Sequence, residues 1–408
     1  MRSIQSYLKT ISLGMGALVV ALGLILFPDT SFTAALRGLK LWWDVVFPAL
    51  LPFFITSEIL LGLGLAHFMG ILLEPFMRPI FNISGYGSFV WTMGFASGYP
   101  ISAKLTCRLR EQNLVTRAEG ERLVSFTTSA DPVFITGAIA VGFFHSAKIG
   151  MILLIVHYLS AILVGFCMKI YRRQDPQSPS PTRQIRGSRL IRALTAMHKA
   201  RIQDGRSMGK LMGDAVSTSL QTQLAIGGFI LLFSVILSLL GRYHIISLVS
   251  EILKKILGFF GLPQEAAQAL IYGLFEVTLG AKEGSELFTS DSTTFILATT
   301  GAILAWGGIS VHAQIASILA ESDLRYFPFF IARVLHAGFA FFLTYLFAPT
   351  FLTHFTGNTI TVWLSRQEPL ELSWWSNELY YLITLFTCGG ILLCAFFLLN
   401  LGKRKRTR

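Results

Sequence analysis

The chain has 408 residues, of which 53% are hydrophobic and only 14% are charged. A soluble protein of this length needs more polar surface to cover one or two cores, so the composition excludes a soluble fold. The formal net charge of +12 could suggest a nucleic-acid partner. The basic residues gather beside apolar segments, however, where they mark the cytoplasmic ends of membrane spans and face anionic lipid, so we expect no nucleic acid.

Several apolar stretches approach 20 residues, the length of helix that crosses a hydrocarbon layer of about 30 Å. In chain order they are residues 11–27, 45–65, 149–170, 224–240, 326–347 and 379–399. The first is expected to be an anchor rather than a cleaved signal peptide, because no small-x-small cleavage site precedes Phe27-Pro28-Asp29. Residues 65–77 and 245–260 predict helices that lie at the membrane interface.

A basic segment divides the membrane part of the chain into two related halves. Residues 174–184 have the Pro, Ser and Gln composition of a linker, and eleven Lys and Arg stand against two Asp between Lys169 and Lys210. Ser102-Ala103-Lys104 matches Gly280-Ala281-Lys282 at an offset of 178 residues, and the same offset aligns two pairs of spans. We therefore expect an N-terminal transmembrane helix with an interfacial segment (1–43), a first repeat (44–171), a basic cytoplasmic linker (172–217), a second repeat (218–350), and an external loop, a last transmembrane helix and a basic tail (351–408).

Each half contains two apolar stretches that are interrupted by Gly, Pro, Ser, Thr or charged residues. They are residues 94–100 and 125–132 in the first half, and 276–280 and 306–312 in the second. Irregular backbone at membrane depth is tolerated only where protein or a water-filled cavity satisfies it. Paired interruptions in two halves therefore indicate the binding site of a transporter, and we expect the four to converge near mid-membrane.

The position of positive charge sets the expected topology. A basic cluster from Lys104 to Arg122 remains cytoplasmic only if residues 89–105 enter the membrane and turn back. Each half then has three crossings and one re-entrant hairpin, and because three is odd the second half is inverted. The expected fold class is an all-α integral membrane protein, an inverted repeat with re-entrant hairpins and broken helices, with about eight crossings and both termini in the cytoplasm.

The candidate substrate-binding residues lie at the interruptions and at two equivalent lysines. Pro132 breaks a helix, so the half-helix after it presents free N–H groups and a positive dipole end to a bound solute. Two lysines that arrive from opposite sides suit a solute with two negative charges. The candidates are Ser97, Gly98, Tyr99, Pro100, Lys104, Thr127, Thr128, Ser129, Asp131, Glu276, Thr278, Lys282, Gly308, Ser310, His312 and Gln314.

Structural explanations stand beside this assignment. The lysines could extend from helix ends to the lipid headgroups, and Asp131 could cap a proline kink. Glycines near residue 308 could serve helix packing. Glu58 and Arg333 could pair with each other, and neither is given a role.

No pattern typical of an enzyme is present. The sequence lacks G-x-S-x-G, a phosphate-binding loop and a spaced set of metal ligands, and its four cysteines form no CxxC pair. We expect no catalysis, no cofactor and no metal. Any transport would then be driven by an ion gradient, by exchange or by the gradient of the solute itself. The sequence does not decide whether the protein forms a homo-oligomer.

Three motifs together resemble a known family. They are FPALLPFF at residues 47–54, SGYP at 97–100 running into Ala103-Lys104, and SFTTSADPVFI at 125–135. They resemble the nucleoside-recognition (Gate) domain family, including sporulation membrane proteins, whose fold is similar to that of concentrative nucleoside transporters. The resemblance implies a multi-pass protein of the cell membrane, in sporulation the outer forespore membrane, that passes dipicolinic acid from the mother cell toward the forespore. A nucleoside or other planar solute is the alternative within transport. A non-transporting sporulation scaffold is the alternative outside it, although a scaffold has no need of polar breaks at membrane depth.

Overall fold

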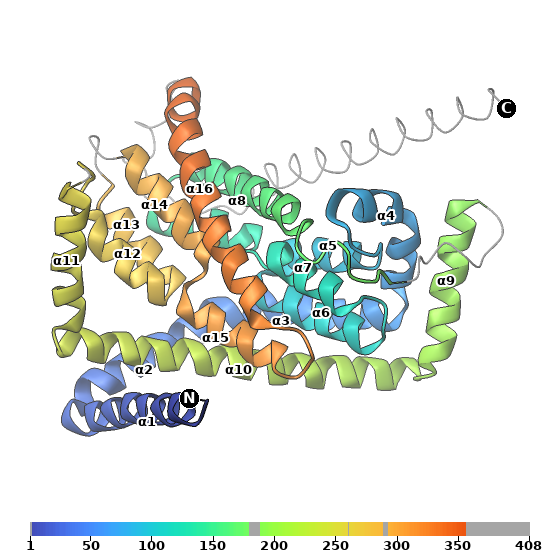
Figure 1. Ribbon diagram of the computed structural model, residues 1–408, viewed down its shortest axis with the longest axis horizontal. Coiled ribbons are helices and arrows are strands. Elements are labelled where there is room, and N and C mark those ends of the chain that lie inside the picture. Colours follow the sequence, from blue (N-terminus) through green and yellow to red (C-terminus); the bar gives the residue numbers. More distant parts are fainter. Residues whose placement is uncertain (1, 179–187, 260, 289–292, 356–408) are drawn as a thin grey trace, which may run out of the picture. The chain divides into compact units, whose positions relative to one another are not determined.

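Apolar segments of this length fold as helices because a chain in lipid must satisfy its backbone hydrogen bonds within the segment. In the computed structural model, the described residues (2–178, 188–259, 261–288 and 293–355) form helices and no strands (Figure 1). The expected last span, residues 379–399, lies outside the described residues. The described helices thus confirm the all-α prediction.

The order of helices repeats along the chain. After α1 (Arg2–Leu26), α2 (Pro28–Leu41) and the π-helix η1 (Trp42–Val46), the first half comprises α3 (Phe47–Gly62), α4 (Leu65–Phe81), α5 (Gly87–Ser97), α6 (Tyr99–Glu111), α7 (Arg117–Thr127), the π-helix η2 (Phe134–Phe143) and α8 (Ala147–Met168). Then follow α9 (Arg189–Asp204) and the second half: α10 (Met208–Arg242), α11 (Ile245–Phe259), α12 (Ala266–Phe275), α13 (Val277–Glu286), α14 (Thr293–Trp306), α15 (Gly308–Leu319) and α16 (Tyr326–Phe355). Because α5 ends at Ser97 and α12 at Phe275, 178 residues later, the predicted repeat is confirmed at its first break.

One interruption in each half is the turn of a helical hairpin. The chain reverses at Gly98, whose φ of +84° favours glycine, and at Glu276 in the second half. Helix α5 packs against α6, and α12 against α13. The helices approach so closely that a Cβ added at Gly280 would overlap the Gly273 backbone. Residues 89–105 are therefore not one straight helix, as expected, and the depth of the hairpins in the membrane stays a prediction.

The other interruption in each half breaks a helix that continues onward. Residues 128–131 are non-helical between α7 and η2, and Gly307, with φ of +83°, separates α14 from α15. Residues Thr293–Leu319 still count as one candidate span of 27 residues. Each half therefore combines a hairpin with a broken helix, in the order that the sequence predicts.

The described residues contain four helices that are long and apolar enough to cross a membrane, or six if each of two bent pairs is one span. The bends measure 106° between α1 and α2 and 83° between α3 and α4. A sharp turn into α4 is what a helix at the membrane interface requires. The inversion of the second half and the total of eight crossings stay predictions.

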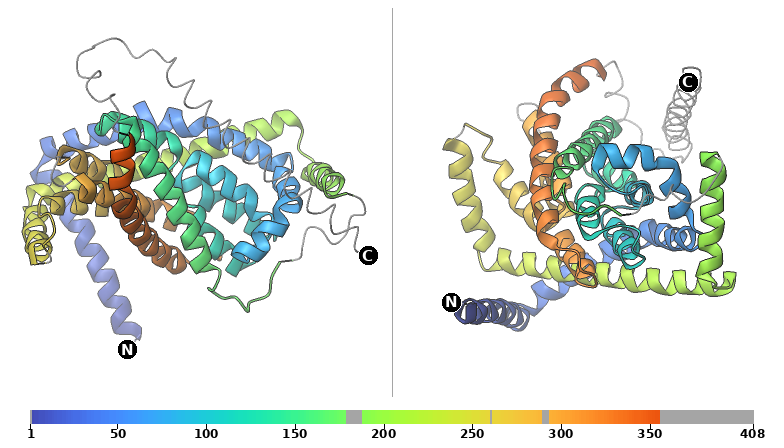
Figure 2. Two further views of the ribbon diagram at one scale, coloured as in Figure 1. Left: turned by 90° about the horizontal axis from the view of Figure 1, so that it is seen from above. Right: turned by 45° about the vertical axis from the view of Figure 1, so that its right-hand side comes forward.

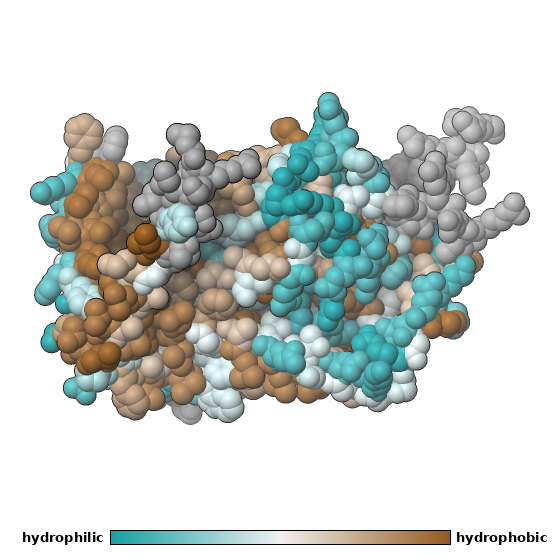
Figure 3. All heavy atoms as spheres, turned by 60° about the horizontal axis from the view of Figure 1, so that its bottom comes forward, coloured by the Kyte–Doolittle hydropathy of each residue, from teal (hydrophilic) through white to brown (hydrophobic). Residues whose placement is uncertain are grey.

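Two large apolar clusters position the breaks. One gathers residues of α6, η2, α8 and α14 around Tyr99, and the other surrounds Phe81 and Phe126. Helix α16 packs against both α14 and α8, so it joins the two halves. Figure 3 shows apolar surface over the side of α1, α2 and α11, whereas hydrophilic residues gather toward α9.

The close hairpin crossing predicts an asymmetric response to two glycine substitutions. Gly280→Ala should lower the midpoint of thermal unfolding, because overpacking costs about 1–3 kcal/mol. Gly228→Ala in α10 is the matched control, since a Cβ there meets nothing within 4 Å. Circular dichroism of both purified variants in detergent measures the difference. Equal midpoints would show that α12 and α13 do not pack as a hairpin.

Candidate functional site

The four interruptions lie beside one another. Gly98, at the tip of the first hairpin, faces Asp131 in the first broken helix, because a Cβ at Gly98 would lie 3.1 Å from Asp131 Oδ2. Gly308, at the start of α15, faces the tip of the second hairpin, because its Cβ would lie 3.0 Å from Glu276 Cα. In each half, a hairpin tip therefore touches the break in its own broken helix.

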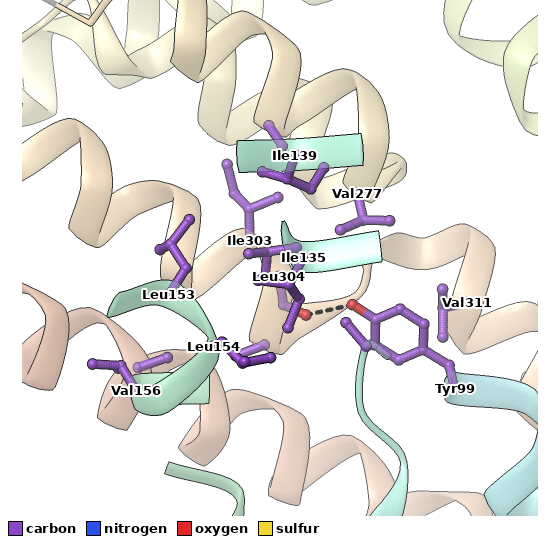
Figure 4. Packing of buried hydrophobic residues seen from close by; sticks show 14 of the residues in the cluster. Tyr99, Ile135, Ile139, Leu153, Leu154, Val156, Val277, Ile303, Leu304 and Val311 are labelled. Atoms are coloured by element: carbon purple, nitrogen blue, oxygen red, sulfur yellow. Dashed lines mark hydrogen bonds between the residues drawn. The ribbon is translucent and has the colours of Figure 1, made fainter. Parts of the chain in front are cut away.

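Tyr99 joins the two halves. Its hydroxyl donates to the Leu304 carbonyl at 2.7 Å, near the C-terminal end of α14 (Figure 4). Its ring also lies close to Gly307, where a Cβ would be 3.5 Å from the nearest ring carbon. The first hairpin thus meets the break of the second half, and the structure brings the four predicted interruptions together.

Arg333 of α16 lies behind this meeting point and is fully buried. Its guanidinium donates to the carbonyls of Ser125 at 2.5 Å and Thr128 at 2.6 Å, at the end of α7, and to that of Ala305 at 3.4 Å, at the end of α14. The last turn of a helix carries carbonyls without helical partners and a partial negative charge. One cation therefore satisfies the C-terminal ends of the broken helices from both halves.

No described carboxylate pairs with Arg333. The guanidinium also contacts Nδ1 of His336 at 3.0 Å and lies 5.3 Å from the centre of the Phe329 ring. Its Nε has no hydrogen-bond partner in the described part of the chain. Among the described residues, the positive charge therefore faces carbonyl and ring dipoles and no second ion.

Two buried histidines extend the contacts of Arg333 to the first break. Arginine only donates, so His336 accepts at Nδ1 and, with its proton assigned to Nε2, donates to the His157 carbonyl at 3.0 Å. The Nε2 of His157 in turn accepts from the Ala130 N–H at 3.1 Å. The Tyr158 hydroxyl lies within hydrogen-bond distance of the carbonyls of Ala130 and Phe95. Helices α8 and α16 therefore hold the non-helical segment of the first half.

The sequence analysis assigns no role to the four residues that hold this segment, which are His157, Tyr158, Arg333 and His336. The histidines lie far apart in the sequence and at no regular helical spacing, so no pattern marked them. Only Arg333 carried a signal, as an arginine at membrane depth. The alternative in which it pairs with Glu58 is wrong, because Glu58 lies 3.7 Å from Lys104 instead.

The two acidic candidates cap helices. Asp131 Oδ1 accepts from the Phe134 N–H at 2.9 Å, at the start of η2. Glu276 Oε2 accepts from the Leu279 N–H at 2.8 Å, at the start of α13, and its Oε1 accepts from the Thr278 hydroxyl at 3.2 Å. The structure therefore shows Asp131 as a helix cap, the structural explanation given in the sequence analysis.

Of the nine buried hydroxyl groups that have no hydrogen-bond partner among the described residues, three lie at the breaks. They belong to Thr128 and Ser129 in the first break and to Ser310 in the second. Most buried polar side chains are satisfied, so an unpartnered group in a native structure calls for an explanation. These hydroxyls flank both breaks.

The remaining polar candidates near the breaks are bonded locally or buried. The Thr127 hydroxyl donates to the Leu123 carbonyl within α7 at 2.8 Å. His312 contacts the Tyr326 hydroxyl at 2.5 Å and the Trp306 carbonyl at 3.2 Å. Gln314 is buried on α15. Ser97 ends α5, and Pro100 is buried in the first turn of α6.

The two lysines do not enter the cluster of breaks. The Nζ of Lys104 donates to the Thr218 carbonyl at 3.1 Å and to the Thr222 hydroxyl, both on α10. The side chain of Lys282 is 58% exposed and lies 3.8 Å from Glu286 on its own helix. The prediction that both lysines lie close to the breaks is therefore corrected, because each extends away to a partner of its own.

Apolar spans, two repeats and polar breaks that meet inside the molecule define an integral membrane protein of the transporter-like class. The model of the nucleoside recognition (Gate) family matches residues 43–158 and 224–322, which lie on the two repeats. The chain is 46% identical over 335 residues to the sporulation integral membrane protein YlbJ of Bacillus subtilis (strain 168), with 82% of each chain covered. The chain therefore belongs to the nucleoside recognition (Gate) family, with YlbJ as a relative.

Solved structures of CNTnw show a distant likeness. The inward-facing, substrate-bound state covers 85% of this chain and 86% of that one, at 12% identity and a TM-score of 0.42. An outward-facing variant covers 83% and 90%, at 13% identity and a TM-score of 0.41. This likeness is too weak to place any residue.

Loss of Arg333 should destabilise the fold. Arg333→Met leaves the carbonyls at two buried helix ends unpaired, and a hydrogen bond from a charged group contributes about 1.5–3 kcal/mol, so we expect a loss of at least about 3 kcal/mol. Arg173→Met, at an exposed position, is the matched control. Thermal unfolding of both variants in detergent measures the effect, and a stable Arg333→Met protein would contradict the role of Arg333.

Proposed function

We propose that the protein is a membrane transporter for a small anionic solute, and that this solute is dipicolinic acid, moved from the mother cell toward the forespore during sporulation. The observation that carries the proposal is the meeting of four helix breaks around buried Arg333, with unpartnered hydroxyls beside them. Transporters build solute sites from such discontinuous helices. The name of the relative YlbJ supports a part in sporulation.

The charge at the breaks supports an anionic solute. Arg333 lacks a carboxylate partner among the described residues, and a bound anion would complete its compensation. Helices α6 and α15 begin at the breaks, so their free N–H groups and positive dipole ends face the same region. Asp131 and Glu276 add negative charge nearby, which keeps binding weak enough for release. A planar dicarboxylate can accept hydrogen bonds both from the Arg333 guanidinium and from the N–H groups at the starts of α6 and α15.

Two ion pairs join the halves on the side that the basic linker marks as cytoplasmic. Arg110 of α6 makes two bonds to Asp323, at 2.9 and 3.0 Å. Arg325 makes two bonds to Glu121 of α7, at 2.7 and 2.9 Å. A solute that enters from the cytoplasm needs these contacts to separate, so the structure represents a state closed on this side under the proposal.

A nucleoside is the second candidate. The family description names nucleoside recognition, and the carboxylates of Asp131 and Glu276 are acceptors that suit ribose hydroxyls. A nucleoside carries no charge, however, so its binding would not add a negative charge to compensate the Arg333 guanidinium. Membership of this family favours transport over catalysis for either solute.

Uptake into proteoliposomes tests the site. Ser129→Ala combined with Ser310→Ala should lower the initial rate of labelled dipicolinate uptake about tenfold or more, because each lost bond to a carboxylate weakens binding. The hydroxyls have no partner in the protein, so folding should be retained. Lys282→Ala, at an exposed position, should transport as the unsubstituted protein does. Uptake of labelled uridine without dipicolinate would overturn the first candidate in favour of the second.

Sporulating cells separate a transporter from a scaffold. A deletion strain should make dipicolinate in the mother cell but deliver little to the spore. The Ser129→Ala, Ser310→Ala protein should reach the membrane and leave the same defect. If this variant restores spore dipicolinate to the level of the unsubstituted protein, the helix breaks are not the solute site and the scaffold alternative gains support.

A further inference from the structure

The basic linker contains a helix that the sequence analysis did not anticipate. Helix α9 begins at Arg189, with the Ser188 side chain as its N-cap, and ends before Gly205. One face of α9 packs on the corner between α3 and α4. Ala193 is fully buried, and Gly64 in that corner lies against the Met197 carbonyl and Ala200. This leaves the other face of the helix without a described protein partner.

The outer face of α9 carries four exposed apolar side chains, with exposed His198 and half-buried Arg201 among them. Leu190, Leu194, Ile191 and Ile202 are 55%, 46%, 57% and 64% exposed. At 100° per residue they lie within an arc of about 120°, opposite the face that packs on the protein. A helix with an apolar stripe open to its surroundings and basic residues next to it is typical of a membrane-surface helix. Exposed Lys199 lies next to this stripe, and Arg189, Arg192 and Arg201 are further basic residues of α9.

A corner separates α9 from α10. Helix α10 is 35 residues long and is one of the candidate spans, and α9 runs across its start in Figure 1 and in the right view of Figure 2. The corner is fixed by Arg206, which bonds Asp204 of α9 at 2.9 Å and Asp214 of α10 at 3.1 Å. The Arg206 guanidinium holds the pKa of Asp204 below its usual range, so the corner stays paired at neutral pH.

Exposed apolar side chains continue along α10 beyond the corner. Met208, Met212, Val216 and Leu220 form an exposed apolar row at a spacing of four along α10. The apolar stripe of α9 is therefore followed by an exposed apolar row on a helix that is a candidate membrane span.

We propose that α9 is a membrane-surface helix that inserts Leu190, Ile191, Leu194 and Ile202 into the cytoplasmic leaflet, while exposed Lys199 binds anionic lipid headgroups. The occupant of this face is the bilayer in which the protein is embedded. Because α9 packs on the α3–α4 corner, this contact also ties the first repeat to the membrane surface. The proposal does not depend on which solute is transported.

Photo-crosslinking in proteoliposomes tests the assignment. The photoreactive residue p-benzoylphenylalanine replaces Leu194 in one full-length variant and Gln203 in another; the two positions lie about 180° apart on the helix, and both are exposed. In vesicles of phosphatidylethanolamine with 30% phosphatidylglycerol, we expect lipid adducts at position 194, detected by mass spectrometry, in several-fold excess over position 203. Adding Lys199→Glu, or using phosphatidylcholine alone, should lower the adduct yield several-fold.

Three results would overturn the proposal. Equal lipid adducts at both positions would show that α9 has no membrane-facing side. Crosslinks from position 194 to a second copy of the chain, without lipid adducts, would show that the apolar stripe is a protein interface. An adduct yield unaffected both by Lys199→Glu and by the removal of phosphatidylglycerol would show that Lys199 does not bind anionic lipid.

Discussion

The structure depends on one buried cation that satisfies two broken helices at once. Arg333 donates to carbonyls at the ends of α7 and α14, which have no partners in their own helices. Unsatisfied backbone groups are costly where water is absent, so the breaks can persist only because a donor of this reach serves both. Arginine suits the role because its planar guanidinium carries five donors and remains charged. The same contacts fix the distance between the halves, because the carbonyls of Ser125 and Thr128 belong to the first half and that of Ala305 to the second.

Most polar groups around Arg333 are bonded to one another and hold the breaks, whereas a few hydroxyls have no partner and remain available to a solute. His157, Tyr158 and His336 satisfy backbone groups near Ala130, and Asp131 and Glu276 cap the half-helices that follow. The hydroxyls of Thr128, Ser129 and Ser310 are left over. A rigid set of satisfied groups around a few unsatisfied ones is the arrangement expected of a preorganised binding site, because the cost of ordering is met in folding.

The sequence predicted the order of the helices better than the contacts between them. Interruptions at Gly98, at residues 128–131, at Glu276 and at Gly307 follow directly from Gly, Pro and charged residues in apolar stretches, and their repetition at one offset made them recognisable. The partners of side chains depend on helix rotation and tilt, which local patterns do not specify. The two lysines match in sequence but extend to unrelated partners, Glu58 and Glu286, and no local pattern predicts that Arg333 joins the halves. Helix α9 falls within the predicted linker, because that prediction rests on the eleven Lys and Arg between Lys169 and Lys210 and not on the apolar spacing within residues 189–204.

The central claim is that the breaks of both halves form one solute site. An experimental structure of the purified protein in lipid nanodiscs with dipicolinate tests it most directly. The account predicts density for a planar dicarboxylate between Gly98 and Ser310, with its oxygens within hydrogen-bond distance of the Ser129 hydroxyl. A bound dipicolinate at any other place in the molecule, or an empty site at saturating dipicolinate, would contradict the account.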